Sequence, residues 1–190
     1  MKMMLEIRHL GLDGVLEIVP KRHGDLRGFF SETWNRRRFL EAGLDFEFVQ
    51  DNHSLSSEAG TLRGLHFQVP PRAQAKLVRV VRGAILDIAV DIRRGSPNFG
   101  KWVGLEILAE KGNQIFVPAG FAHGFLTLEP NTEVLYKVTA YYSPEHDRAV
   151  RYDDPDIGIA WPTHLAPYKL STKDSSAPRL SEIDTGFVFQ

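Results

Sequence analysis

Glycine, proline and asparagine divide the middle of the chain into short segments that each have the pattern of a β-strand. Leu77–Arg82 is rich in β-branched residues and ends at Gly83, and alternate residues of Ala84–Asp91 form an apolar face. Runs of about 4–8 residues with these properties, bounded by turn residues, are typical of strands. Four more such segments follow, namely Trp102–Leu108, Gln114–Val117, Gly124–Leu128 and Val134–Tyr142. Strands this short and this closely spaced predict a β-sandwich, a jelly roll or a small barrel.

One segment before this series has the signals of a helix. The sequence predicts it over Thr33–Gly43, with Thr33 as the N-cap and Gly43 as the C-terminal stop. After Ser143 the chain is rich in Pro, Asp and Ser, and we expect an irregular tail packed over the strands. A chain of 190 residues is long enough for one domain that buries about 70% of its unfolded surface. We therefore expect a single all-β domain over residues 1–190, with a few short peripheral helices.

The composition excludes several classes of protein. The 23 Lys and Arg residues balance 24 Asp and Glu residues, so bulk charge favours neither nucleic acid nor an anionic membrane as a partner. The absence of cysteine excludes disulfides, thiolate nucleophiles and zinc–thiolate sites. No run approaches the roughly 20 apolar residues of a membrane span, and the N-terminus lacks the pattern of a signal peptide. We therefore expect a cytoplasmic protein.

Two of the seven histidines lie in glycine-containing motifs. Gly60 stands six residues before His66, and His123 closes a G-x5-P-x-G-x2-H pattern that begins at Gly112. Each histidine taken alone favours a hydrogen-bonded structural role over a catalytic one. Together the two patterns resemble the two motifs of the cupins, which are built on a double-stranded β-helix jelly roll. The resemblance implies this jelly roll as the fold.

The first of these motifs departs from that of the metal-binding cupins. Those proteins carry a second histidine two residues after the first, followed closely by a glutamate. Here Gln68 takes the place of the second histidine, and Pro70–Ala73 occupy the region of the glutamate. An amide oxygen is a poor replacement for the imidazole and carboxylate ligands that a divalent transition metal prefers. We therefore expect no metal.

Strand alternation places some polar residues on common faces. Tyr136 and Tyr142 are six residues apart, so a regular strand would project both to one face. They could pack in the core, or one could donate a proton while the other stacks on a ligand, and spacing alone does not decide between these roles. Arg63 and His66 are three positions apart, an odd number, so their joint use requires a twist or a bulge at Gly64.

The order of motifs from about Gly24 to Asp174 resembles the dTDP-4-dehydrorhamnose 3,5-epimerase family. The motifs include G-D-x-R-G-F-F-x-E, F-V-Q-D-N-H-S, L-R-G-L-H-F-Q, A-Q-x-K-L-V-R, V-P-x-G-F-A-H-G-F, L-Y-K and S-T-K-D. The resemblance implies a cofactor-free, cupin-like homodimer. It also implies a substrate, dTDP-4-dehydro-6-deoxy-glucose, whose product enters dTDP-rhamnose and polysaccharide biosynthesis.

The resemblance also implies a role for each matching residue. His66 would be the general base, Asp174 its orienting carboxylate, Tyr136 the proton donor on the opposite face of the sugar, and Lys76 the cation beside the enolate oxygen. The positions implied to bind the nucleotide sugar are Arg27, Glu32, Gln50, Asp51, Asn52, Arg63, His123, Tyr142, Asp147 and Lys173. Asp147 is a departure, because the family commonly has glutamate there.

The implied chemistry explains why histidine, tyrosine and lysine are needed. A C4 ketone acidifies the protons at C3 and C5, and histidine titrates in the range where it can remove them. Three alternatives stay open: an epimerase that inverts only C3 or only C5, a metallocupin oxygenase or isomerase, and a non-catalytic sugar-binding cupin. The first would use the same residues, the second would contain metal, and the third would not depend on His66, Tyr136 or Asp174.

Overall fold

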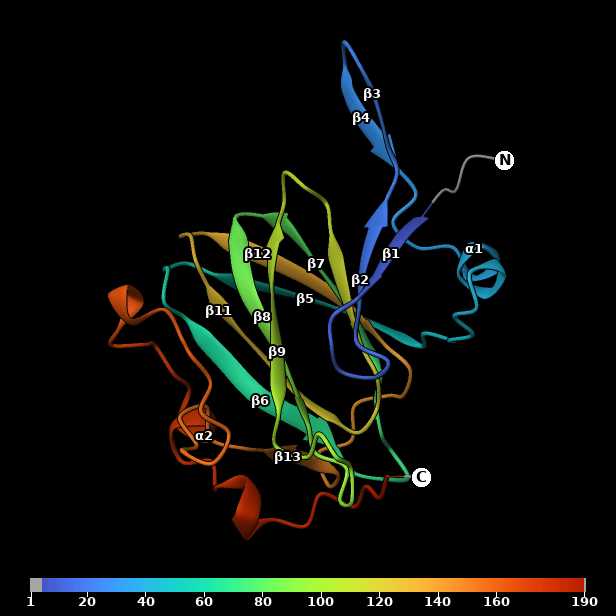
Figure 1. Cartoon of the computed structure of the whole chain (residues 1–190). Coiled ribbons are helices and arrows are strands. Elements are labelled where there is room, and N and C mark those ends of the chain that lie inside the picture. The colour runs from blue at the N-terminus through green and yellow to red at the C-terminus, as the bar shows by residue number, and fades with distance from the viewer. Residues whose placement is uncertain (1–4, 190) are drawn as a thin grey trace.

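Two antiparallel sheets packed face to face form the body of the protein in a computed structural model, which describes residues 5–189 (Figure 1). The six-stranded sheet has the order β1-β2-β10-β7-β12-β5 and the five-stranded sheet the order β13-β6-β11-β8-β9, while β3 and β4 form a separate hairpin. The strands are β1 (Leu5–His9), β2 (Leu16–Pro20), β3 (Arg22–Asp25), β4 (Gly28–Ser31), β5 (Gln50–Ser56), β6 (Leu62–Gln68), β7 (Lys76–Arg82), β8 (Ala84–Asp91), β9 (Trp102–Leu108), β10 (Gln114–Val117), β11 (Phe121–Thr127), β12 (Thr132–Val138) and β13 (Asp147–Ala149). The helical segments are α1 (Arg36–Glu41), η1 (Thr163–Leu165), α2 (Thr172–Ser175) and η2 (Leu180–Glu182).

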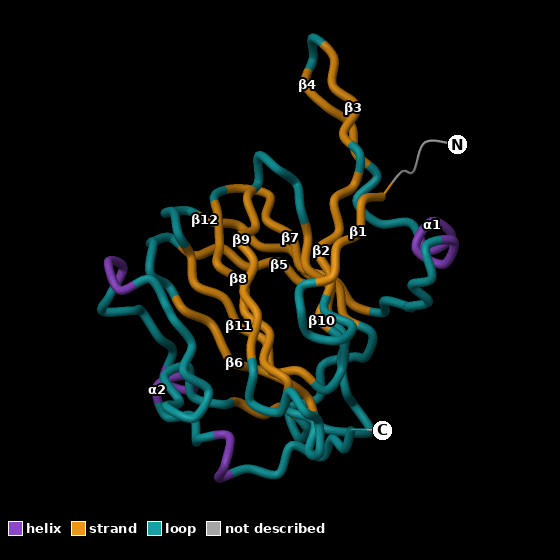
Figure 2. The backbone as a smooth tube through the Cα atoms, in the orientation of Figure 1, coloured by secondary structure: helices purple, strands orange, loops and turns teal. Residues whose placement is uncertain are grey.

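The space between the two sheets is filled at one end by apolar side chains from alternate strand positions. Val78 and Val134 of the six-stranded sheet meet Ile85 and Phe125 of the five-stranded sheet, and all four are buried. Strand β8 is buried on both faces, because its other face packs against the C-terminal part of the chain. The helices lie at the periphery, so the expected all-β class is confirmed (Figure 2).

The C-terminal part of the chain packs on the outer face of the five-stranded sheet. Ile157, Trp161 and Leu180 of this segment share an apolar cluster with Leu62 of β6 and Val90 of β8. Trp161 also donates a hydrogen bond of 2.9 Å from its indole nitrogen to the carbonyl of Tyr152. Held by these contacts, the segment runs past β6, and its helix α2 contacts this strand (Figure 1).

The helix predicted over Thr33–Gly43 begins later than expected, whereas its predicted C-terminal stop is confirmed. Helix α1 begins at Arg36, and its N-cap is Asn35, whose side-chain oxygen accepts hydrogen bonds from the backbone of Arg37 and Arg38. Asparagine is among the strongest N-caps, so it sets the start in place of Thr33. Gly43 follows the helix with φ +81°, as expected for a C-terminal stop.

Two of the predicted strand boundaries were also wrong. Strand β12 ends at Val138, four residues before Tyr142, because the side chain of Thr139 accepts a hydrogen bond from the backbone of Ala75 and the chain then leaves the sheet. The argument that Tyr136 and Tyr142 share a strand face therefore does not hold. Strand β11 begins at Phe121 rather than Gly124, directly after the turn at Gly120.

The distortion expected at Gly64 is present, as a bulge. His66 lies opposite His123 and Arg63 opposite Phe125, so β6 carries one more residue than β11 between these two pairs. Gly64 has φ +121°, and a Cβ atom there would lie 2.6 Å from the Cα atom of Gly124. The extra residue turns Arg63 and His66 to the same face of β6, while Leu65 remains in the apolar cluster on the other face.

Within residues 5–189, no helix is both long and apolar enough to span a bilayer.

Candidate active site

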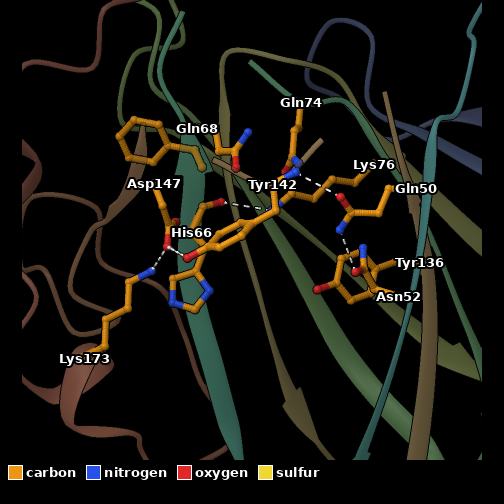
Figure 3. A pocket seen from close by; sticks show the side chains of 11 residues that line it. Gln50, Asn52, His66, Gln68, Gln74, Lys76, Tyr136, Tyr142, Asp147 and Lys173 are labelled. Carbon is orange, nitrogen blue, oxygen red and sulfur yellow. Dashed lines mark hydrogen bonds and ion pairs between the residues drawn. The ribbon is translucent and has the colours of Figure 1, made fainter. Parts of the chain in front are cut away.

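A cavity of about 310 Å³ opens between the two sheets beside the apolar core, against which its lining residue Tyr136 packs. Its walls combine residues of β5, β6, β7 and β12 with residues of the C-terminal segment. It is lined by Gln50, Asn52, His66, Phe67, Gln68, Gln74, Lys76, Tyr136, Tyr142, Asp147 and Lys173 (Figure 3). Eight of the residues singled out in the sequence thus come together, from segments far apart in the chain.

His66 is held by a buried carboxylate behind it. Its Nε2 atom lies 2.6 Å from Oδ1 of Asp174, which is 3% exposed and sits in α2. Burial alone would raise the pKa of Asp174, but hydrogen bonds from His66, Ser171 and the backbone N–H of Gly64 hold it below its usual value. The carboxylate is therefore ionised and keeps one ring nitrogen protonated, which leaves the other nitrogen free to act as a base.

Lys76 is the buried cation of the cavity. It opens β7, and its Nζ atom donates a hydrogen bond of 3.3 Å to the carbonyl of His66. Burial lowers the pKa of Lys76 from 10.5 to about 8, against the attraction of Asp87 and Asp147. A desolvated ammonium group stabilises a developing negative charge more strongly than one in water does.

Tyr136 enters the cavity from the sheet opposite His66. It lies on β12 of the six-stranded sheet, whereas His66 lies on β6 of the five-stranded sheet. Burial raises the pKa of Tyr136 despite the nearby charge of Arg63, so its hydroxyl keeps its proton at neutral pH. The cavity therefore has an imidazole on one wall and a protonated phenol on the other.

A chain of polar contacts closes the rim of the cavity. The hydroxyl of Tyr142 donates to Oδ2 of Asp147 over 3.2 Å, and the ammonium group of Lys173 pairs with the same oxygen. Figure 3 shows the Tyr142 ring extending over the cavity toward His66. Asp147, although one carbon shorter than the glutamate common in the family, reaches both partners from β13.

His123 lies behind the cavity and not in its wall. Its Nε2 atom is 2.9 Å from Oδ2 and 3.0 Å from Oδ1 of Asp87, and both side chains are buried. Burial lowers the pKa of His123 and raises that of Asp87. The pair stands next to His66 in the sheet register, so within one chain His123 supports the site instead of lining it.

Four other predicted binding residues lie outside the cavity of the same chain. Arg63 faces it from β6 but is bonded to Ser56 and the carbonyl of Leu55. Asp51 points to the opposite face of β5, where it pairs with Lys137. The other two belong to the N-terminal region: Arg27 at the exposed tip of the β3–β4 hairpin, and Glu32 beside α1, where it accepts a hydrogen bond from Asn35. Their binding roles stay predictions.

Sequence reasoning missed three lining residues, Phe67, Gln68 and Gln74. Gln68 was considered only as the replacement of a metal ligand, and Gln74 was not considered. Gln68 lies two residues after His66, and Gln74 lies two residues before Lys76. Strand alternation could therefore have placed Gln68 on the same face as His66. In residues 5–189, no group of three or more His, Cys, Asp or Glu side chains has the arrangement of a metal site.

Comparison with known proteins agrees with this arrangement. Residues 9–182 match the family model described as dTDP-4-dehydrorhamnose 3,5-epimerase. The chain belongs to this family. A dTDP-4-dehydrorhamnose 3,5-epimerase of Sinorhizobium fredii is a family relative that is 53% identical over 180 residues, covering 95% of this chain and 92% of the relative.

Solved structures of the family show the same cupin-like jelly roll. A dTDP-6-deoxy-D-glucose-3,5-epimerase from Legionella pneumophila, in complex with dTDP-4-keto-L-rhamnose, has a TM-score of 0.92 and 43% identity, covering 98% of this chain and 99% of that one. A 3'-monoepimerase from Streptomyces bikiniensis, in complex with dTDP-quinovose, has a TM-score of 0.85 and 38% identity, covering 90% and 86%. The jelly roll expected from the cupin motifs is confirmed.

Proposed function

We propose that the protein epimerises dTDP-4-dehydro-6-deoxy-glucose at C3 and C5 to dTDP-4-dehydro-rhamnose, the isomerisation that leads to dTDP-rhamnose. The observation that carries the proposal is the pair of His66, held by Asp174, and Tyr136 on opposite walls of one cavity. An isomerase that moves protons across a sugar ring needs a base and an acid in this arrangement. Membership of the family supports the choice of substrate.

In the proposed mechanism His66 removes the proton from C3 or C5, and the C4 oxygen gains negative charge as the enolate forms. Asp174 fixes the ring of His66 and stabilises the imidazolium, as in hydrolytic triads. Lys76 supplies positive charge to the enolate oxygen. Tyr136 then returns a proton to the opposite face of the carbon, which inverts that centre. The sugar must present each carbon to the same pair in turn.

A coupled assay tests the proposed function. The purified protein is incubated with dTDP-4-dehydro-6-deoxy-glucose and a reductase specific for the doubly inverted sugar, and the product is identified by chromatography and NMR. Formation of dTDP-L-rhamnose supports double epimerisation. A product inverted at one carbon would instead place the protein with single-centre epimerases such as the Streptomyces bikiniensis relative.

The pKa of Lys76 predicts how activity depends on pH. The ammonium form is present below its pKa of about 8 and is lost as pH rises through it, so kcat/KM should fall on the alkaline side with a midpoint near 8. Lys76→Met should lower kcat/KM by about 10²-fold or more and abolish this alkaline limb. An alkaline limb that persists in Lys76→Met would assign it to another group.

We further propose a homodimer in which the β3–β4 hairpin of one copy completes the cavity of the other. The hairpin projects from the body of the chain and exposes Leu26, Phe29 and Phe30 (Figure 1). Exposed apolar side chains of this size on a projecting element are typical of an interaction surface. Arg27 lies at the tip of this hairpin, and Glu32 follows it, so both could serve a partner's site.

Complementation between two inactive variants tests this arrangement. Chains carrying Arg27→Ala and chains carrying His66→Ala are given different affinity tags, co-expressed and purified through both tags. A mixed dimer should contain one cavity with both residues intact and should regain activity that neither parent dimer has. Mixed dimers as inactive as the parents would overturn the exchange of the hairpin.

The cytoplasmic location of the protein stays a prediction.

A further inference from the structure

Three glutamine side chains surround the backbone of the segment that carries Tyr142. Gln50 accepts a hydrogen bond of 2.9 Å from the N–H of Tyr142. Gln68 accepts one of 2.8 Å from the N–H of Ser143 and donates one of 3.3 Å to the carbonyl of Tyr141. Gln74 donates one of 2.7 Å to the carbonyl of Ala140. The four consecutive residues 140–143 are thus each bonded to one of the three amides, which we call the glutamine clamp.

Gln68 is the buried centre of the clamp. Its side chain is 3% exposed, and its Nε2 atom donates a second hydrogen bond, of 2.6 Å, to the carbonyl of Arg72. Both hydrogens of the amide group and its oxygen therefore have backbone partners. A buried amide with all its donors satisfied is rigid, because moving it would leave several polar groups unpaired.

The clamp determines where the ring of Tyr142 can lie. Strand β12 ends at Val138, so the sheet ladder does not fix the backbone of residues 140–143. The side-chain amides replace that ladder, and Asp147 holds the hydroxyl at the far end of the ring. Figure 3 shows the ring between the clamp and His66, over the mouth of the cavity. Tyr142 is 56% exposed, so packing contributes little to its position.

We propose that Gln68 and Gln74 are positioning residues that hold Tyr142 across the mouth of the cavity before the nucleotide sugar binds. This inference rests on the proposed function. It explains why the ring of Tyr142, which would stack on the substrate, lies where it does. A ring fixed in advance binds substrate without the entropy cost of ordering a loop. It also fixes the sugar relative to His66 and Tyr136, where a displacement of about 1 Å can cost about 10²-fold in rate.

The test is the replacement Gln68→Met, which keeps the length of the side chain and removes its hydrogen bonds. We expect kcat/KM to fall about 10- to 100-fold, with KM raised, because the misplaced ring no longer orients the substrate. In a Tyr142→Ala background the same replacement should cost less than about threefold, because residues that act through one another are not additive. Equal losses in both backgrounds would overturn the proposal.

Asn113→Leu is the matched control. Asn113 is also a buried amide with three hydrogen bonds, to Glu17, the carbonyl of Glu106 and the N–H of Leu108, and it does not line the cavity. We expect it to lower thermal stability as Gln68→Met does while leaving KM unchanged. A rise in KM as large as that of Gln68→Met would show that the effect comes from general loss of stability.

Two further measurements separate this inference from the proposed function. If the wild-type protein is inactive on the substrate, the proposed function fails, and amide hydrogen exchange still tests the clamp. Faster exchange at Tyr142 and Ser143 in Gln68→Met is expected, and unchanged exchange would refute the clamp. If Gln68→Met does not fold, Gln74→Met takes its place, because it removes only one hydrogen bond. The same comparison of kcat/KM with and without Tyr142→Ala is then made, and a smaller fall is expected.

Discussion

Replacing His66 with asparagine should abolish deuterium exchange at both C3 and C5 of the substrate while leaving dTDP binding unchanged. The ring is the one imidazole among the residues that line the cavity, and Asp174 bonds it from behind. Loss of a positioned base costs about 10²–10⁴-fold in rate. Exchange is followed by proton NMR, and dTDP binding by calorimetry.

The variant Asp174→Asn provides the companion to this experiment. Its amide is nearly the same size as the carboxylate but carries no charge to stabilise the imidazolium, so the rate should fall by about 10²-fold or more at both carbons. If His66→Asn or Asp174→Asn slowed exchange at one carbon only, a second base would act at the other. A shared base would then be excluded.

Replacing Gly64 with alanine should destabilise the protein by more than about 3 kcal/mol, because two costs coincide at this position. Its φ of +121° is rarely adopted by residues with a Cβ atom, and the added atom would meet the backbone of Gly124 at 2.6 Å and of His123 at 2.7 Å. The neighbours are backbone and cannot rotate away. Urea denaturation at one fixed protein concentration measures the loss.

Gly95→Ala is the control that measures the loss of stability from the positive φ angle alone. Gly95 has φ +82°, but no other heavy atom lies within 4 Å of the position of an added Cβ. We expect a loss of about 1–2 kcal/mol there. A loss at Gly64 no larger than at Gly95 would mean that the two strands separate easily at the bulge, and that the placement of His66 does not depend on it.

The sequence predicted the site where strand alternation was unambiguous. The odd spacing of Arg63 and His66 meant that they could share a face only with a twist or a bulge at Gly64, and the structure has a bulge there. The segments from Leu77 to Val117 were assigned as strands with errors of at most one residue. These segments have strong alternation and are bounded by glycine or proline, so local sequence determines them.

Prediction failed where the boundary depends on contacts between distant residues. The end of β12 at Val138 cannot be read from the local sequence, because the partners of residues 139–143 are Ala75, Gln50, Gln68 and Gln74, which lie far away in the chain. The pairing of His66 with Asp174 spans 108 positions and was available only through the family resemblance. The position of the β3–β4 hairpin away from the cavity could not be derived from its sequence, since its residues contact little of their own chain.

Proton NMR in deuterated water tests the central claim most directly. The purified protein is incubated with dTDP-4-dehydro-6-deoxy-glucose, and the signals of the C3 and C5 protons are followed over time. We predict that both signals disappear and that both centres invert in the wild-type protein, with no change in His66→Asn. Loss of one signal only would contradict double epimerisation, and loss of neither, with dTDP still bound, would contradict catalysis by this site.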